Sequence, residues 1–398
     1  MTWTPPVRGP VAQQIYAAAE KDRADRPEHY RFDADAVVQR ATKRGARVED
    51  FFADGWEDGL ETFLRSAEEE AALNAVGIRM ALQSAAGRLS AGAHIAAAFR
   101  EDPYLRNTPL APPIVILGGW RTGTTFLFRL LGRDPRLHAP LPVELVAPWM
   151  SFRDPETTSA ASQLLHTLNP DMALVHPSGP DLPEECVLAM GTDLRNWGFT
   201  SMMRLPSYAG WLAGQDFAGS YARYREVLQL IGSGDQRRFV LKAPPAHTAE
   251  LDHLVEAFPG AVIVQIHRDI VETLTSGGAT LFGVYRSTYS DHVDAVDVGR
   301  QQVYQSELWL RRAVEFRTSA TDAPVTFVDL EYSTLVEDTA SCLAKIYAAA
   351  DTEPVEHPDR FVAAYHAAHP RTAHAYQRCT PEDFGLNPDE LRERFSFL

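Results

Sequence analysis

The sequence has little of several features that would point to particular protein classes. It contains three cysteines, and Cys186, Cys342 and Cys379 are far apart without the spacing of metal ligands. We therefore expect buried free thiols in a reducing compartment. No run approaches the roughly 18 uninterrupted apolar residues of a membrane span, and the N-terminus lacks the apolar stretch of a signal peptide. These absences predict a cytoplasmic protein without a membrane span.

Positive charge is also scarce. The formal net charge is -15, and Lys21, Lys43, Lys242 and Lys345 are the only lysines. A nucleic acid or an anionic membrane needs a basic face, so neither is an expected partner. A small phosphorylated ligand needs only a few local cations and stays possible. Because arginine carries nearly all of the positive charge, each of the four lysines is a slightly stronger candidate for a specific functional role.

The order of the predicted elements indicates an α/β protein. The chain has 398 residues, of which 45% are hydrophobic, which is enough for one large domain or two smaller ones. Residues 11–100 have spaced apolar side chains in Ala-, Glu- and Arg-rich surroundings, a pattern typical of helices. Short apolar strands then alternate with helices, which predicts a parallel sheet flanked by helices. These strands are expected at 114–119, 237–245, 261–269 and 324–333.

The same pattern predicts one compact domain with a helical extension before it. We expect a helical N-terminal extension over residues 1–108 and an α/β domain over residues 109–398. A mixed segment at about 140–235 interrupts that domain between its first two strands. The sequence shows no internal repeat, and the oligomeric state cannot be predicted from it.

The first of these strands runs into "GGWRTGTT", which has the form of a phosphate-binding loop followed by a helix. Gly119 and Gly123 allow backbone conformations in which successive N–H groups converge on an anion. Thr124 and Thr125 would begin the helix, where free N–H groups and hydroxyls bind phosphate oxygens, and Arg121 would add a forked cation. The lysine of a triphosphate loop is missing, because Thr124 follows the second glycine. This absence argues against hydrolysis of ATP or GTP.

The loop resembles the 5′-phosphosulfate loop of sulfotransferases that use 3′-phosphoadenylyl sulfate (PAPS). That family also has a strand ending in Arg, followed eight residues later by a Ser, and "HRDIVETLTS" supplies Arg268 and Ser276. Arg268 would lie at the carboxyl end of a strand, where open α/β sheets bind ligands. The resemblance covers roughly residues 112–398 and implies a P-loop-type fold with PAPS as the donor and no metal. The residues implied to bind PAPS are Arg121, Thr122, Gly123, Thr124, Thr125, Arg268 and Ser276.

The resemblance also suggests catalytic groups. Lys242 ends the second strand in "FVLKAPPAH", where related enzymes place a lysine against the leaving phosphate. The base that deprotonates the acceptor stays open among three candidates. Glu144 lies 23 residues after Arg121, close to the family spacing, and is ranked first. His247 follows Lys242 by five residues instead of the two of cytosolic sulfotransferases, and the Glu184-Glu185 pair is the third candidate.

The acceptor cannot be identified from the sequence. The resemblance implies transfer to a hydroxyl or an amine of a small-molecule, lipid or glycan acceptor that approaches from the 140–235 segment. An atypical P-loop kinase and a nucleotide-binding member without turnover are the alternatives. A late basic segment, 369–378, carries Arg371, His374, Tyr376 and Arg378, and it either closes over the nucleotide or forms a solvated loop.

Overall fold

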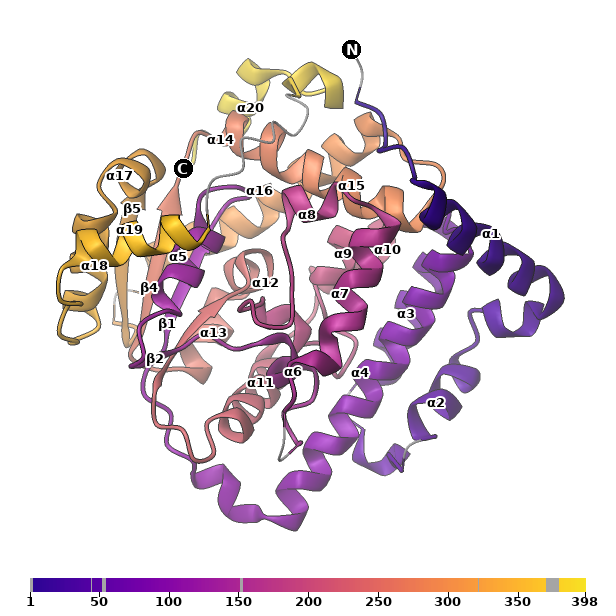
Figure 1. Cartoon of the computed structure of the whole chain (residues 1–398), viewed down its shortest axis with the longest axis horizontal. Helices are drawn as coiled ribbons and strands as arrows, with labels where there is room; N and C mark the ends of the chain where they lie inside the picture. The colour runs from indigo at the N-terminus through magenta and orange to yellow at the C-terminus, as the bar shows by residue number, and fades with distance from the viewer. Residues whose placement is uncertain (1–2, 44, 52–54, 151–152, 321, 370–378) are drawn as a thin grey trace.

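The computed structural model describes residues 3–43, 45–51, 55–150, 153–320, 322–369 and 379–398. It contains a parallel sheet of five strands in the order β2-β3-β1-β4-β5, whose labelled strands lie toward the left in Figure 1. The strands are β1 (Ile114–Gly118), β2 (Leu137–His138), β3 (Arg238–Lys242), β4 (Ala261–His267) and β5 (Val325–Glu331). The predicted parallel α/β fold is therefore confirmed, with the two-residue strand β2 as an addition.

The strands form where the sequence is continuously apolar. Nearly every residue of β1 and β4 is buried, because helices cover both faces of the sheet, whereas β5 alternates between buried and exposed positions at one edge. On one face, Ile114 and Ile116 of β1 pack with α5 and α18. On the other face, Val115 and Leu117 join a larger apolar core. The sheet thus separates two hydrophobic clusters.

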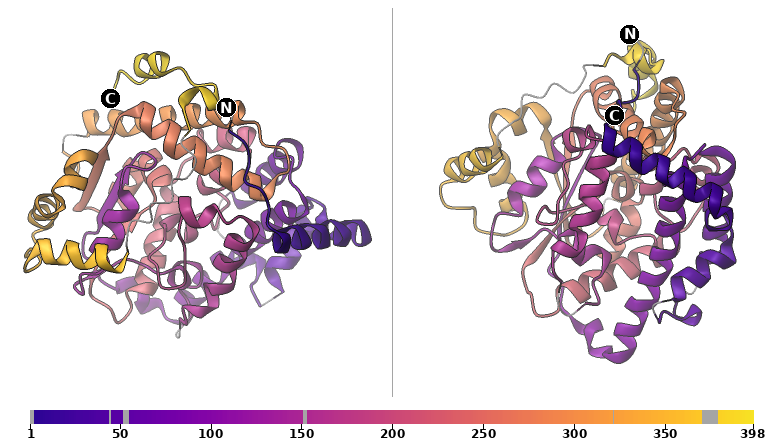
Figure 2. Two further views of the ribbon diagram at one scale, coloured as in Figure 1. Left: turned by 45° about the horizontal axis from the view of Figure 1, so that its top comes forward. Right: turned by 45° about the vertical axis from the view of Figure 1, so that its right-hand side comes forward.

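Among the described residues, four α-helices precede the sheet. They are α1 (Pro10–Asp25), α2 (Ala34–Thr42), α3 (Trp56–Glu70) and α4 (Ala75–Glu101). The Asn74 side chain caps α4 by accepting a hydrogen bond from the N–H of Gly77 at 2.9 Å. Helix α4 packs against α2 and α3 and reaches α15 of the α/β part, so the N-terminal helices lie directly against the rest of the molecule (Figures 1 and 2).

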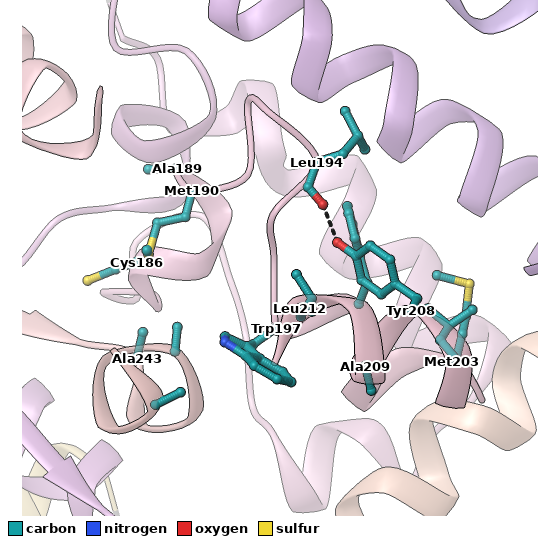
Figure 3. Close-up of a cluster of buried hydrophobic side chains, with 14 of the residues drawn as sticks. Cys186, Ala189, Met190, Leu194, Trp197, Met203, Tyr208, Ala209, Leu212 and Ala243 are labelled. Atoms are coloured by element: carbon teal, nitrogen blue, oxygen red, sulfur yellow. Dashed lines mark hydrogen bonds between the residues drawn. The ribbon is translucent and has the colours of Figure 1, made fainter. Parts of the chain in front are cut away.

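Short helices make up most of the segment between β2 and β3. They are α6 (Pro142–Val146), α7 (Glu156–Leu168), α8 (Met172–Val175), α9 (Gly198–Met202), α10 (Pro206–Leu212) and α11 (Ala218–Ile231). A buried cluster holds part of this segment against α3. There the Tyr208 hydroxyl donates a hydrogen bond to the Leu194 carbonyl oxygen, beside Trp197 and Leu212 (Figure 3).

The other helices connect and cover the strands. They are α5 (Thr124–Leu131), α12 (Pro244–Ala249), α13 (Leu251–Ala257), α14 (Ile270–Glu272), α15 (Thr280–Tyr289), α16 (Ala295–Ser319), α17 (Tyr332–Glu337), α18 (Thr339–Ala349), α19 (Pro358–Ala368) and α20 (Pro388–Arg394). Short 3₁₀ turns are η1 (Pro27–Tyr30), η2 (Val48–Asp50), η3 (Pro103–Asn107), η4 (Cys186–Leu188) and η6 (Pro381–Phe384), and η5 (Thr273–Ala279) is a π-helical turn. Within the described residues, no helix has both the length and the apolar character that crossing a membrane requires.

Candidate active site

The loop between β1 and α5 has the backbone of an anion-binding turn. Arg121 and Gly123 adopt left-handed conformations, with φ of 58° and 86°, and α5 begins at Thr124. Gly123 is the N-cap residue, and no side chain caps the helix. The first N–H groups of α5 therefore stay available to an anion.

The loop residues divide into those that face a cavity and one that supports the loop. Gly123, Thr124 and Thr125 line a cavity of about 570 Å³, together with Arg121. Thr122 is buried instead, and its hydroxyl donates to the Gly119 carbonyl oxygen at 2.8 Å. Thr122 thus stabilises the turn, and its neighbours, rather than its hydroxyl, line the cavity.

Arg268 and Ser276 line the same cavity from the other side of the loop. The Arg268 guanidinium donates to the Arg121 carbonyl oxygen at 2.8 Å and to Glu272 at 2.9 Å, and it stacks over the Tyr332 ring at 4.4 Å. The Ser276 hydroxyl donates to the Glu272 carbonyl oxygen at 2.7 Å. Both phosphate motifs expected from the sequence therefore meet in one cavity.

The guanidinium groups of Arg121 and Arg268 make this cavity positively charged, and their partial burial reduces screening by water. Burial is the main cause that lowers the pKa of Arg121 from its usual value, and the nearby Arg268 lowers it further, although Tyr332 opposes the shift. Two arginines held this close, without a carboxylate on Arg121 among the described residues, favour an anion between them.

A π-helical turn lets the Ser276 segment approach the loop closely. A Cβ atom added at Gly277 would lie 2.6 Å from Cγ of Arg121 and 2.7 Å from Cβ of Trp120. Glycine is therefore required for this contact, and the irregular turn places Ser276 beside the loop.

Lys242 reaches the same cavity from the end of β3, which pairs with β1 on the side opposite to β4. Parallel pairing sets Lys242 beside Ile116, and its side chain forms an ion pair with Glu185. Only 3% of Lys242 is exposed. A charge this deeply buried needs a partner, and the Glu185 carboxylate supplies it.

A second pair adjoins the first. His176 Nε2 lies 3.1 Å from a carboxylate oxygen of Glu184, and the Glu185 N–H donates to Glu184 at 2.8 Å. Burial is the largest influence on both side chains and disfavours their charged forms. Their mutual attraction outweighs it, so the pKa of His176 is raised and that of Glu184 falls to about 2. The two groups therefore form a charged pair at neutral pH.

The same acidic residues could hold a cation. Ligand atoms of His176, Glu184 and Glu185 lie within 4.8 Å of one another, and Glu250, Asp252 and His253 form a second group of this kind. In the first group, however, each carboxylate already has a cationic partner, Glu184 with His176 and Glu185 with Lys242. These pairs neutralise the carboxylates without a metal.

A second, more apolar cavity of about 370 Å³ opens beside the first. The two cavities share Trp120, His176, Glu185 and Leu281. The second is lined mainly by the segment between β2 and β3 and by α15, and it also receives Arg88 of α4. The carboxylate of Glu185 therefore stands where a donor site and an acceptor site would meet.

Comparison with known proteins agrees with this geometry. The profile described as "Sulfotransferase family" matches residues 112–357. This chain belongs to the sulfotransferase family.

Two solved sulfotransferases share the fold of this family member. STF1 from Mycobacterium tuberculosis H37Rv is 27% identical, with a TM-score of 0.78, and covers 92% of this chain and 98% of its own. STF9 from Mycobacterium avium is 22% identical, with a TM-score of 0.79, and the match covers 91% of this chain and 94% of its own. At this identity the likeness is evidence for the fold and for nothing further.

Curated relatives match a shorter stretch. The omega-hydroxy-beta-dihydromenaquinone-9 sulfotransferases Stf3 of Mycobacterium bovis and Mycobacterium tuberculosis are each 26% identical over 255 residues. That match spans 59% of this sulfotransferase-family chain and 62% of the relatives' length.

Two of the predicted catalytic residues lie outside the cavity that holds the phosphate motifs. Glu144 lines a third cavity of about 360 Å³, where it accepts from the Leu141 N–H at 2.7 Å and contacts His138 Nε2 at 3.0 Å. His247 is fully buried with its Nδ1 2.9 Å from the Tyr221 hydroxyl, and burial lowers its pKa to about 3. The structure thus brings Lys242 together with Glu185, and it does not bring Glu144 or His247 to them.

Sequence reasoning missed His176 and Tyr332. Tyr332 directly follows β5, so its place at the carboxyl edge of the sheet could have been inferred from the strand order. His176 comes from an irregular segment after α8, and no periodicity points to it. The basic residues Arg371, His374, Tyr376 and Arg378 lie outside the described residues.

Proposed function

We propose that this protein transfers a sulfuryl group from PAPS to the hydroxyl of an acceptor held in the second cavity. The single observation that carries the proposal is the position of the Lys242–Glu185 pair, which lines the phosphate-motif cavity at the point where the apolar cavity joins it. Family membership and the two phosphate motifs support the choice of donor.

The donor would bind along the carboxyl edge of the sheet. The free N–H groups of α5, the side chains of Thr124 and Thr125, and Arg121 would hold the 5′-phosphosulfate. Arg268 and Ser276 would hold the 3′-phosphate. Tyr332 would keep the Arg268 guanidinium flat and correctly oriented, because the ring already stacks against it.

The reaction needs a base and a cation. The acceptor oxygen forms a bond to sulfur while the bond from sulfur to the bridging oxygen breaks, and adenosine 3′,5′-bisphosphate leaves. We assign the base to Glu185, which takes the hydroxyl proton, and the cation to Lys242, which stabilises the charge on the bridging oxygen. The His176–Glu184 pair would fix the segment that carries Glu185, since the Glu185 N–H donates to Glu184.

The acceptor is expected to be largely apolar. The second cavity is lined by residues such as Val146, Leu165, Phe199, Met202 and Leu281, and its volume of about 370 Å³ falls in the range of small-molecule sites. The curated relatives are named for a lipid acceptor, which agrees with such a lining. An amine or a glycan fits this lining less well than an alcohol on an apolar body.

Calorimetric titration with adenosine 3′,5′-bisphosphate tests the donor site. We expect saturable binding by the wild type and about 10- to 100-fold weaker binding by Arg268→Ala, the loss expected for charge-assisted hydrogen bonds. Arg133→Ala is the matched control, because Arg133 is exposed and lines the third cavity instead. Its affinity should equal that of the wild type. In that titration, no binding of the bisphosphate by the wild type, or equal losses in Arg268→Ala and Arg133→Ala, would show that the donor site is wrong.

Transfer of labelled sulfate from PAPS to apolar alcohols tests the reaction. Tighter binding of Mg²⁺-ATP than of the bisphosphate would favour a kinase. Binding without transfer to any member of a broad acceptor panel would favour a member without turnover.

A further inference from the structure

The apolar cavity contains one charged side chain that the proposed reaction does not use. Arg88, in the middle of α4, lines this cavity together with side chains such as Val187, Leu188 and Phe199. It comes from the N-terminal helices, outside the region that the family profile matches. A cation in such a wall requires an explanation, because removing a guanidinium from water costs free energy.

The protein supplies hydrogen-bond acceptors for only some of the N–H donors of Arg88. The guanidinium donates a hydrogen bond to the Leu188 carbonyl oxygen, which uses one of its five N–H donors. Among the described residues, no carboxylate forms an ion pair with it. Burial lowers the pKa of Arg88 to about 10, so the side chain is still charged at neutral pH.

The other charged side chains that line the cavity are already paired. Glu184 is paired with His176, and Glu185 with Lys242, so neither carboxylate neutralises Arg88. The Asn196 amide donates to the carbonyl oxygens of Val187 and Met190 at 3.0 and 3.1 Å, which holds the wall in place. Among the described residues that line this cavity, Arg88 is therefore the cation without a carboxylate partner.

We propose that Arg88 binds a carboxylate of the acceptor, so that the enzyme selects amphipathic hydroxy acids. The apolar body of such an acceptor would fill the cavity, its hydroxyl would lie at Glu185, and its carboxylate would meet the planar fork of Arg88. Carboxylate and guanidinium match in geometry, and a partly desolvated site strengthens their hydrogen bonds. This inference rests on the proposed sulfuryl transfer for the role of the hydroxyl.

Paired substrates test the selectivity. A series of ω-hydroxy fatty acids of increasing chain length, each compared with its methyl ester, presents the same apolar body with and without the charge. We expect the wild type to favour the best acid over its ester by at least about 10-fold in kcat/KM, with the difference mainly in KM. In Arg88→Met the acid-to-ester ratio should fall towards one, and in Arg88→Lys it should take an intermediate value.

The matched control is Arg79→Met, which removes an exposed arginine from the same helix. Its acid-to-ester ratio should equal that of the wild type. Adenosine 3′,5′-bisphosphate affinity, measured for every variant, shows whether the fold is intact. A wild type that treats acid and ester alike, or prefers the ester, would overturn the proposal, and so would an Arg88→Met variant that binds the nucleotide normally and keeps the preference.

A binding measurement separates this inference from the proposed function. Fatty acids that lack the hydroxyl, and their methyl esters, can be titrated in the presence of adenosine 3′,5′-bisphosphate without any turnover. Acid binding that depends on Arg88, combined with no sulfate transfer, would mean that the carboxylate site is right and the reaction wrong. Sulfate transfer to neutral alcohols with no preference for acids would mean the reverse.

Discussion

At the scale of single residues, Glu144 and Glu185 show how surroundings decide what a carboxylate can do. Burial alone would raise the pKa of Glu144, but the hydrogen bond from His138 and the Leu141 N–H lower it below its usual value. A carboxylate held in this way is a weak base and faces a different cavity. Glu185 instead lies beside a buried ammonium group where two cavities join.

Glu185→Gln is expected to lower kcat by about 10²- to 10⁴-fold, because the amide cannot take the acceptor proton. Steady-state sulfate transfer measures this effect, and adenosine 3′,5′-bisphosphate binding shows whether the donor site survives. Glu144→Gln is the matched control, with an expected change of less than about 10-fold. If Glu144→Gln instead abolishes turnover and Glu185→Gln does not, the base assignment must be reversed.

His247 should make stability depend on pH. Burial lowers its pKa to about 3 in the folded protein, against about 6.5 in the unfolded chain. The unfolded chain therefore binds the proton first as the pH falls. The stabilisation by neutral His247 is complete above pH 6.5 and is lost progressively towards pH 3, at up to about 1.4 kcal/mol per pH unit.

Urea unfolding at several pH values between about 5 and 7 measures this dependence. His247→Gln should flatten the decline of the free energy of unfolding towards low pH. His29→Gln, which changes an exposed histidine, should leave the slope unchanged. Equal slopes for the wild type and His247→Gln would show that the pKa of His247 is the same in the folded protein as in the unfolded chain.

Residues at strand ends were predictable, and residues in loops were not. Lys242 ends an apolar strand and Arg121 and Arg268 follow two others, and the ends of parallel strands meet at one edge of a sheet. Spacing along the chain could not decide which cavity Glu144 enters, because α6 turns its carboxylate towards His138. The pairing of Glu185 with Lys242 depends on the path of a long irregular segment, which carries no periodic pattern.

At the scale of elements, the central strands were predicted and the π-helical turn was not. Continuous apolar runs identify β1, β3 and β4 and an alternating run identifies β5, whereas β2 is too short to form a pattern. The turn Thr273–Ala279 depends on a tertiary contact, since its two glycines fit against neighbouring side chains. Local sequence alone does not encode that contact.

Gly277→Ala should weaken the nucleotide site through this contact. The added methyl group would overlap Arg121 and Trp120, so the loop must move or the turn must unwind. We expect about 10-fold or more weaker binding of adenosine 3′,5′-bisphosphate and a loss of about 1–3 kcal/mol in the free energy of unfolding.

The matched control is Gly210→Ala in α10, where an added Cβ meets nothing within 4 Å. Alanine favours helices, so this variant should be unchanged or stabilised by up to about 1 kcal/mol. Titration and urea unfolding compare the two. A Gly277→Ala variant as stable and as tight-binding as Gly210→Ala would mean that the turn adapts without cost.

At the scale of the whole molecule, the N-terminal helices and the α/β part share one core. The larger hydrophobic cluster includes Leu82 and Leu89 of α4 together with Leu241 of β3 and Trp309 of α16. The predicted boundary at residue 108 therefore separates two parts of the sequence, and we infer that these two parts fold together as one unit.

The chain is expected to unfold in a single transition. Tryptophan fluorescence and far-ultraviolet circular dichroism should give the same urea midpoint, because no part can leave the shared core intact. The fragment 109–398 should fail to fold, since it would expose the apolar surface that α3 and α4 cover. Two separate transitions, or a stable fragment that binds adenosine 3′,5′-bisphosphate, would contradict this expectation.

The contact between Lys242 and Glu185 would also affect a donor that is bound while no acceptor is present. While the ammonium group neutralises the carboxylate, Glu185 is poorly placed to activate a stray water molecule, and the donor would survive in the open site. A hydroxyl arriving from the apolar side would have to separate the pair, freeing the base and the cation in one movement. The ion pair would then protect the bound donor from hydrolysis until the acceptor itself separates the two side chains.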